Sequence, residues 1–132
     1  MARGKMVMLD TNIIIELIKN NSGIKQTVEE IGLDQLAISA ITAGEIFYGA
    51  FNQIEMKRIN KHLQNYFMLS ITPQVSDIFV DLMRQYSLSH KPFIGDMLIA
   101  ATALHNNMAL FTLNIKDFSF IPKLKIYTPK QN

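Results

Sequence analysis

Cysteine and long hydrophobic runs are both missing from this sequence of 132 residues. Without cysteine there are no disulfide bonds and no thiolate metal ligands, which fits a reducing cytosol. No apolar run approaches the ~20 residues of a membrane-spanning helix. The apolar stretch that follows Arg3 and Lys5 ends at Asp10 and is too short for a secretory signal. We therefore expect a cytoplasmic protein that makes no contact with a membrane.

The sequence also has no repeat, low-complexity tract or long linker, and its composition is that of a folded chain. Hydrophobic residues make up 48% and charged residues 18%, which argues against disorder. The length suits one domain over residues 1–132, with a core at about residues 5–128. A mean hydropathy of +0.12 indicates an apolar surface for a partner protein.

Strand-like and helix-like segments alternate along the chain. Short apolar runs predict strands at residues 5–9, 36–39, 68–71, 109–112 and 125–127. Helical spacing predicts helices at 12–19, 23–31, 42–51, 53–67, 75–86 and 95–106, with Thr72-Pro73 starting the fifth and a loop at 87–93. This alternation predicts an α/β fold in which helices flank a central parallel sheet of four to five strands. Such sheets carry their sites at the carboxyl ends of the strands.

Four acidic residues lie where that edge is expected. Asp10 and Asp117 follow predicted strands, Glu45 comes soon after another, and Asp96 opens a helix. Each has an ordinary alternative as a helix cap, a turn residue or a partner of the helix dipole. Thr42-x-x-Glu45, for example, matches a capping box, and Asp10-Thr11-Asn12 could cap the first helix, with Thr11 or Asn12 as the expected cap residue.

Taken together, the four acids indicate a metal site. Neighbouring carboxylates repel one another unless a cation lies between them. Hard oxygen ligands without cysteine or paired histidines favour Mg²⁺, or Mn²⁺ in its place. Two such ions could activate a water and stabilise the leaving oxygen of a phosphodiester. The net charge is +2, so acids gathered in one pocket would leave the remaining surface basic and suited to a polyanion.

Four motifs carry a resemblance to a known family. They read LDTN at residues 9–12, ITAGEIFYG at 41–49, DMLIAATA at 96–103 and TLNIKDF at 112–118. In this order and spacing they resemble the PIN-domain nucleases, and most of all the VapC-type toxins of bacterial and archaeal toxin–antitoxin modules. The resemblance covers roughly residues 6–118, and Leu113 stands where the last motif of the family usually has arginine.

The resemblance implies a Mg²⁺-dependent endoribonuclease that hydrolyses RNA phosphodiester bonds by metal-activated water. It also implies a homodimer, and a cognate antitoxin that binds the toxin in a larger complex. It assigns metal binding and catalysis to the four acids Asp10, Glu45, Asp96 and Asp117. Supporting positions are Thr11, Asn12, Thr112 and Asn114.

Basic residues near these motifs are candidate contacts for RNA. Lys91 and Lys116 flank the acidic motifs in the sequence. A second group, Lys57, Arg58 and Lys61, forms a stripe on one predicted helix. The alternative for this stripe is a solvated helix face.

The three histidines show no metal-ligand spacing. We expect His62 and His105 to be structural or solvated, and His90 to be a candidate substrate contact because it lies in the loop before Asp96.

Two other functions compete with the nuclease hypothesis. One is another Mg²⁺-dependent phosphotransfer or phosphatase domain, and the other is a catalytically degenerate RNA-binding protein. A phosphatase of the aspartyl-phosphate type would carry a second aspartate at position 12, where this chain has Asn12. A receiver domain would carry its phosphoacceptor aspartate after the middle strand, where this chain has Ile71-Thr72-Pro73. The complete set of acids argues against a degenerate pocket.

Overall fold

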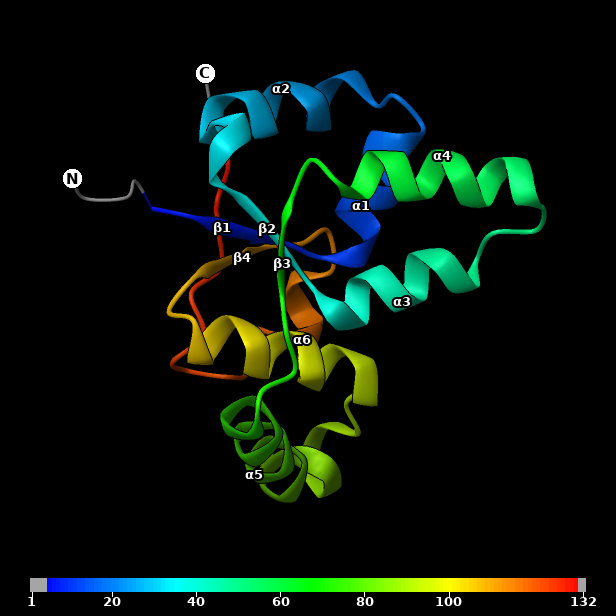
Figure 1. Ribbon diagram of the computed structural model, residues 1–132. Coiled ribbons are helices and arrows are strands. Elements are labelled where there is room, and N and C mark those ends of the chain that lie inside the picture. Colours follow the sequence, from blue (N-terminus) through cyan, green and yellow to red (C-terminus); the bar gives the residue numbers. More distant parts are fainter. Residues whose placement is uncertain (1–4, 131–132) are drawn as a thin grey trace.

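The computed structural model describes residues 5–130 as helices packed around one parallel sheet (Figure 1). The sheet has the strand order β3-β2-β1-β4. Its members are β1 (Val7–Leu9), β2 (Leu36–Ser39), β3 (Phe67–Leu69) and β4 (Ala109–Phe111), and every neighbouring pair is parallel. The predicted α/β class with a parallel sheet is confirmed, and the number of strands within residues 5–130 is four.

The connections between strands contain six α-helices. These are α1 (Thr11–Ile18), α2 (Ser22–Ile31), α3 (Ala40–Tyr48), α4 (Gln53–Leu63), α5 (Pro73–His90) and α6 (Ile94–His105). Two short 3₁₀ turns, η1 (Leu33–Gln35) and η2 (Ile115–Asp117), complete the described elements. No helix in residues 5–130 combines the length and the apolar character that crossing a bilayer requires.

Alternating side chains of the sheet form two separate cores. Leu9, Ile38 and Phe111 belong to the core shared with α1 to α4, whereas Met8 and Leu110 belong to the core shared with α5 and α6. This two-residue period follows from the strand pleat, which sends successive side chains to opposite faces. The two groups of helices accordingly cover opposite faces of the sheet (Figure 1). Burial on both faces explains why β1 is apolar at every position rather than at alternate ones.

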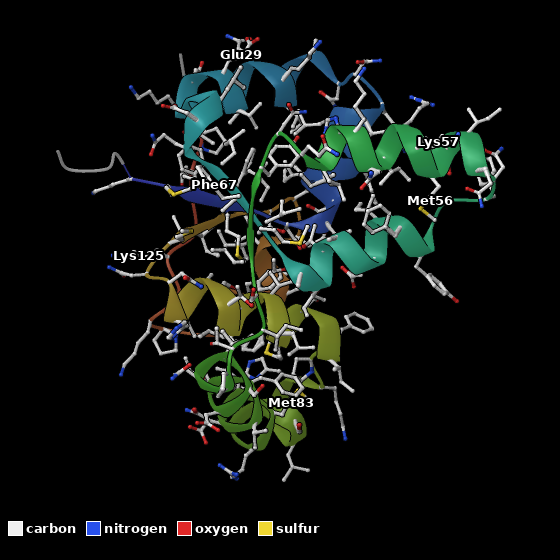
Figure 2. The ribbon with its side chains drawn as sticks, viewed as in Figure 1. Glu29, Met56, Lys57, Phe67, Met83 and Lys125 are labelled. Atoms are coloured by element: carbon white, nitrogen blue, oxygen red, sulfur yellow. The ribbon has the colours of Figure 1, made fainter. Side chains whose placement is uncertain are left out.

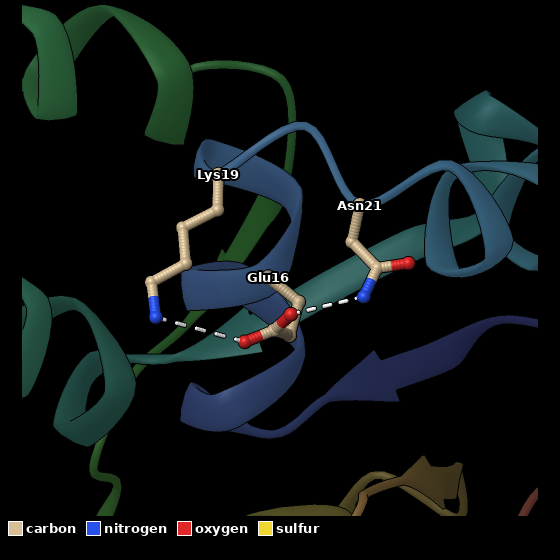
Figure 3. A network of polar contacts seen from close by, with 3 residues as sticks. All are labelled: Glu16, Lys19 and Asn21. Carbon is tan, nitrogen blue, oxygen red and sulfur yellow. Dashed lines mark hydrogen bonds and ion pairs between the residues drawn. The ribbon is translucent and has the colours of Figure 1, made fainter.

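Side-chain caps fix where several helices begin. Thr72 Oγ1 accepts a hydrogen bond from the backbone N–H of Val75, and Pro73 occupies the first helical position of α5, as the sequence predicts. At the turn between α1 and α2, Asn21 caps α2 and also donates to Glu16 at 2.9 Å, while Lys19 lies 3.9 Å from the other Glu16 oxygen (Figure 3). Glu16 is therefore engaged at this turn and takes no part in the acidic edge.

Several predicted boundaries are wrong. The loop expected at 87–93 is mostly helix, because α5 continues to His90 and stops only where Lys91 turns left-handed (φ 47°) ahead of Pro92. The helix expected at 53–67 ends at Leu63, since Phe67 pairs with Ala37 in the sheet. The strand expected at 125–127 makes only an isolated bridge from Ile126 to Leu110.

Candidate active site

Asp10 leaves the end of β1 and caps α1. Its Oδ1 accepts a 2.8 Å hydrogen bond from the backbone N–H of Thr11, and its own N–H donates to the carbonyl of Phe111 on the neighbouring strand β4. Asp10 itself is therefore the cap, which corrects the expectation that Thr11 or Asn12 would cap this helix. The residue is only 4% exposed, and burial raises the pKa of its carboxyl while hydrogen bonds from Thr112, Thr11 and Asn12 oppose that rise.

The loop after β4 is tied to the loop after β1. The buried hydroxyl of Thr112 donates to Asp10 Oδ2 at 2.7 Å, and Asn12 Nδ2 reaches the same oxygen at 3.3 Å. Asn12 Oδ1 accepts from the backbone N–H of Leu113, and the N–H of Asn114 donates to Thr112 Oγ1. Three of the predicted supporting residues, Asn12, Thr112 and Asn114, thus join the ends of β1 and β4 around the Asp10 carboxylate.

Glu45 is held by a chain of hydroxyl groups. Thr11 Oγ1 lies 2.5 Å from Glu45 Oε1 and 3.1 Å from Thr42 Oγ1, and Ser39 Oγ lies 3.3 Å from Thr42 Oγ1. A hydroxyl has a single proton to donate. Because the short contact to the carboxylate takes the proton of Thr11, the chain runs from Ser39 through Thr42 and Thr11 to Glu45.

This arrangement replaces the capping box that the sequence suggests. Ser39 caps α3, since its Oγ accepts from the backbone N–H of Thr42. Glu45 lies beyond the first turn of α3 and extends to α1 instead of returning to its own helix start. Thr42 lies three residues before Glu45 and so matches the motif, but the residue that caps this helix is the serine at the end of β2.

Asp96 lies in the first turn of α6 and faces the other acids. Burial, followed by the charges of Asp10, Asp117 and Glu45, raises the pKa of Asp96 to about 6. Asp10, Glu45 and Asp96 line one surface pocket of ≈ 680 Å³, with Thr11, Asn12 and Asn114 also in its wall. Its apolar lining, from Ile15, Ile41 and Tyr48, is not foreseen from the sequence.

A narrower cleft lies on the other side of Asp96. It has a volume of ≈ 160 Å³, and Asp117 of η2 lines it together with Asp96. Lys91 and Lys116 both line this cleft as well, and His90 lies in its wall, stacked on Phe120 with ring centroids 4.2 Å apart. The two lysines are thus brought beside the acidic pocket, as their place in the sequence suggests.

The other basic residues and histidines lie elsewhere. Lys57, Arg58 and Lys61 are exposed on α4, which packs on the face of the sheet opposite α6, and Figure 2 shows Lys57 there. None of the three lines either pocket. His62 contacts Tyr66 at 2.7 Å, and burial lowers the pKa of its imidazole, while His105 is exposed.

The donor chemistry of the pocket fits a hard divalent cation. All four acids present carboxylate oxygens, and the groups that donate hydrogen bonds to Asp10 and Glu45 are hydroxyls and amides. Within residues 5–130 the ion pairs are Lys19–Glu16 and Arg84–Asp81, so no basic side chain of that part neutralises the four acids. As the side chains stand, no three acids or histidines of the described chain are placed to hold one ion together, and Mg²⁺ commonly needs only one or two carboxylates with water completing its shell.

Known proteins resemble this chain along most of its length. Residues 7–123 match the family described as PIN domain. Ribonuclease VapC1 of Haemophilus influenzae (strain R2866) is 32% identical over 126 residues, which cover 89% of this chain and 93% of that protein. Ribonuclease VapC10 of Mycobacterium tuberculosis (strain ATCC 25618 / H37Rv) is 28% identical over 122 residues, which cover 91% of each.

Solved structures agree with these matches. The toxin–antitoxin complex from Klebsiella pneumoniae has a chain that superposes with a TM-score of 0.78 at 32% identity, over 96% of this chain and 99% of that one. VapBC-1 from nontypeable Haemophilus influenzae superposes with a TM-score of 0.79 at 28% identity, over 92% and 96%. By its sequence and its fold, the chain belongs to the PIN domain family.

Proposed function

We propose that this protein is a Mg²⁺-dependent endoribonuclease and the toxin of a toxin–antitoxin pair. The observation that carries the proposal is the group of four mutually repelling carboxylates, without a basic partner among residues 5–130, on a chain of the PIN domain family. The similar proteins named ribonuclease support RNA as the substrate. We propose Mg²⁺ as the natural ion because carboxylate oxygens suit it, with Mn²⁺ as a substitute.

Each acid has a distinct part in this proposal. Asp10, Glu45 and Asp96 would hold the ion in the larger pocket, and Asp117 would contribute from the adjoining cleft. Bound Mg²⁺ would supply a Lewis acid that polarises the phosphate and makes a water more acidic. Asp96 must lose its proton to act as a ligand, and its pKa of about 6 allows this at neutral pH. Hydrogen bonds from Thr112 and Asn12 keep the Asp10 carboxylate oriented toward the pocket.

Lys91 and Lys116 are the RNA contacts that we favour. Both line the cleft beside Asp96 and Asp117, where a phosphate next to the scissile one would lie. The stripe formed by Lys57, Arg58 and Lys61 is on another face, so we propose it at most as a secondary contact for a long RNA.

The proposed antitoxin would cover the apolar turn between α3 and α4. Tyr48 is 92% exposed and Phe51 82%, and Ile54 follows them on α4. Such a cluster is costly to leave in water and marks a partner surface. Tyr48 also lines the acidic pocket, so a protein bound here would lie at the entrance to the site. The solved toxin–antitoxin complexes with this fold support a partner of this kind. We also propose that the protein is a homodimer and that it is located in the cytoplasm. Light scattering of the purified protein would find or refute the homodimer.

The test is cleavage of structured RNA by the purified protein with Mg²⁺, Mn²⁺ or EDTA. We expect cleavage with either metal, none with EDTA, and loss of cleavage in Asp96→Asn. RNA that stays intact under every metal condition would refute the nuclease. Retained RNA binding without cleavage would instead favour the degenerate binding protein, and release of phosphate from a small phosphomonoester would favour a phosphatase.

A further inference from the structure

Gly95 lies unusually close to the carboxylate of Glu45. A Cβ atom built on Gly95 would stand 2.9 Å from Glu45 Oε2, a separation that real Cβ atoms essentially never show. Gly95 is in the first turn of α6, immediately before Asp96, whereas Glu45 projects from α3. Two elements that are far apart in the sequence therefore approach each other here only because position 95 has no side chain.

The backbone conformation does not explain this glycine. Among the glycines of residues 5–130, only Gly32 has a positive φ. Glycine within a helix is less favourable than alanine. Gly95 brings that cost without relieving any backbone strain. Its close approach to Glu45 therefore explains why position 95 carries glycine.

The opposite side of the same carboxylate is also fixed. Glu45 Oε1 accepts a hydrogen bond from Thr11 Oγ1 at 2.5 Å, and the hydroxyl chain through Thr42 to Ser39 fixes Thr11 in turn. Oε2 is the end of a flexible side chain, but turning it away from Gly95 would strain the bond between Glu45 and Thr11. A methyl group at position 95 would therefore push the Glu45 carboxylate out of its place beside Asp96.

We infer that Gly95 is a positioning residue that lets Glu45 reach the metal site. This inference rests on the proposed function, because it treats Glu45 and Asp96 as partners around one ion. Gly95 touches neither metal nor RNA itself. Its contribution is the absence of a Cβ, which leaves room for the longer of the two facing carboxylates.

The test is Mn²⁺ binding by isothermal titration calorimetry, without RNA, for the natural protein, Gly95→Ala and Gly23→Ala. Gly23 is a matched control, since it too is in the first turn of a helix, and a Cβ there would meet only Asn21 Oδ1 at an ordinary 3.5 Å. We expect Gly95→Ala to weaken Mn²⁺ binding by about tenfold, as is usual for a residue that orients a metal ligand. Gly23→Ala should bind as the natural protein does.

A second pair of variants distinguishes positioning from general damage to the fold. Glu45→Asp shortens the side chain by one methylene group and moves the carboxylate away from position 95. In that background, adding Gly95→Ala should change Mn²⁺ affinity by less than about twofold, because the clash has been removed. In cleavage assays Gly95→Ala should lower kcat and leave KM for RNA near its natural value.

The outcomes separate this inference from the function on which it rests. If the natural protein binds Mn²⁺ and Gly95→Ala binds it equally well, Gly95 has no positioning role although the metal site stands. If Gly95→Ala costs the same in the natural protein and in the Glu45→Asp variant, the effect is a general disturbance of α6. If the natural protein binds no Mn²⁺, both the proposed function and the role of Gly95 are refuted.

Discussion

Replacing Asp96 by asparagine is expected to stabilise the protein when no divalent metal is present. In the folded chain, burial and the charges of Asp10, Asp117 and Glu45 raise the pKa of Asp96 from its ordinary 3.8 to about 6. Below pH 3.8 the carboxyl is neutral in both folded and unfolded chains, so folding carries no free-energy penalty for burying a charge there. Between pH 3.8 and 6 the unfolded chain loses this proton first, and the free energy of unfolding falls as the pH rises. Above pH 6 the full penalty is present.

The magnitude follows from the same pKa values. A rise from 3.8 to about 6 corresponds to about 3 kcal/mol at roughly 1.4 kcal/mol per pKa unit. Asp96 is only half-buried, so solvent screening reduces the expected gain of Asp96→Asn to about 1–2 kcal/mol. For a chain of this length that gain raises Tm by several degrees.

The measurement is urea unfolding followed by circular dichroism in EDTA, at about pH 4 and about pH 7, on either side of the folded pKa. Asp96→Asn should be more stable than the natural protein at the neutral pH and nearly equal to it at the acidic one. Asp34→Asn is the control, because Asp34 is exposed in η1 and its replacement should matter by less than about 0.5 kcal/mol at either pH. A variant that gains nothing at neutral pH, or keeps its gain in acid, would show that repulsion among the acids is not what limits stability.

Saturating Mg²⁺ should reverse the order of stability. A ligand at about 100 times its Kd stabilises the folded state by about 2.7 kcal/mol, provided that it does not bind the unfolded chain. The natural protein should gain this stabilisation, and Asp96→Asn should gain much less. If both proteins respond equally to Mg²⁺, the ion binds somewhere other than at Asp96.

Four further variants test the other parts of the site and one helix cap outside it. Asp10→Asn should abolish cleavage, and urea unfolding should show a loss of about 1 kcal/mol, because its amide would direct a donor at Thr112 where an acceptor is needed. Thr112→Val should cost about 1–2 kcal/mol in the same assay, since it leaves Asp10 Oδ2 without its buried donor. The double variant Lys91→Gln/Lys116→Gln should raise KM for RNA severalfold and leave Mn²⁺ affinity unchanged. Because up to two phosphate contacts would be lost, the slope of log affinity against log salt should become shallower by up to about 2. Thr72→Ala removes the cap of α5 far from the site, so it should lower the free energy of unfolding by about 1 kcal/mol without changing kcat.

The sequence was sufficient to locate the four acids because each lies close to the end of a short apolar run or the start of a helix. In a parallel sheet the strands end at one edge, and the structure places Asp10, Glu45 and Asp96 around one pocket there. The fold class was predictable because the apolar runs alternate with helical spacing. Thr72-Pro73 was readable as a helix start because its signal is confined to adjacent residues.

The contacts that orient the acids were not predictable, because they join distant parts of the chain. Thr11 and Glu45 are 34 positions apart, and Asp10 and Thr112 are 102 apart. No local pattern could choose between Glu45 as half of a capping box and Glu45 as a partner of Thr11. Gly95 did offer a signal, because a glycine inside a predicted helix often has a packing reason. The sequence alone could not show that its packing neighbour is Glu45.

The choice of partners around the acids explains how a small chain could keep the proposed metal site ready. Lysine or arginine beside Asp10 or Glu45 would orient these carboxylates equally well, but would also neutralise them and remove the attraction for a cation. The hydroxyls of Thr11 and Thr112 and the amide of Asn12 orient the oxygens and leave the negative charge intact. The uncompensated charge destabilises the metal-free fold, and that same free energy becomes part of the affinity when the ion binds. Neutral donors close to the carboxylates, with lysines kept in the neighbouring cleft, therefore allow one pocket edge to attract both a cation and a polyanion.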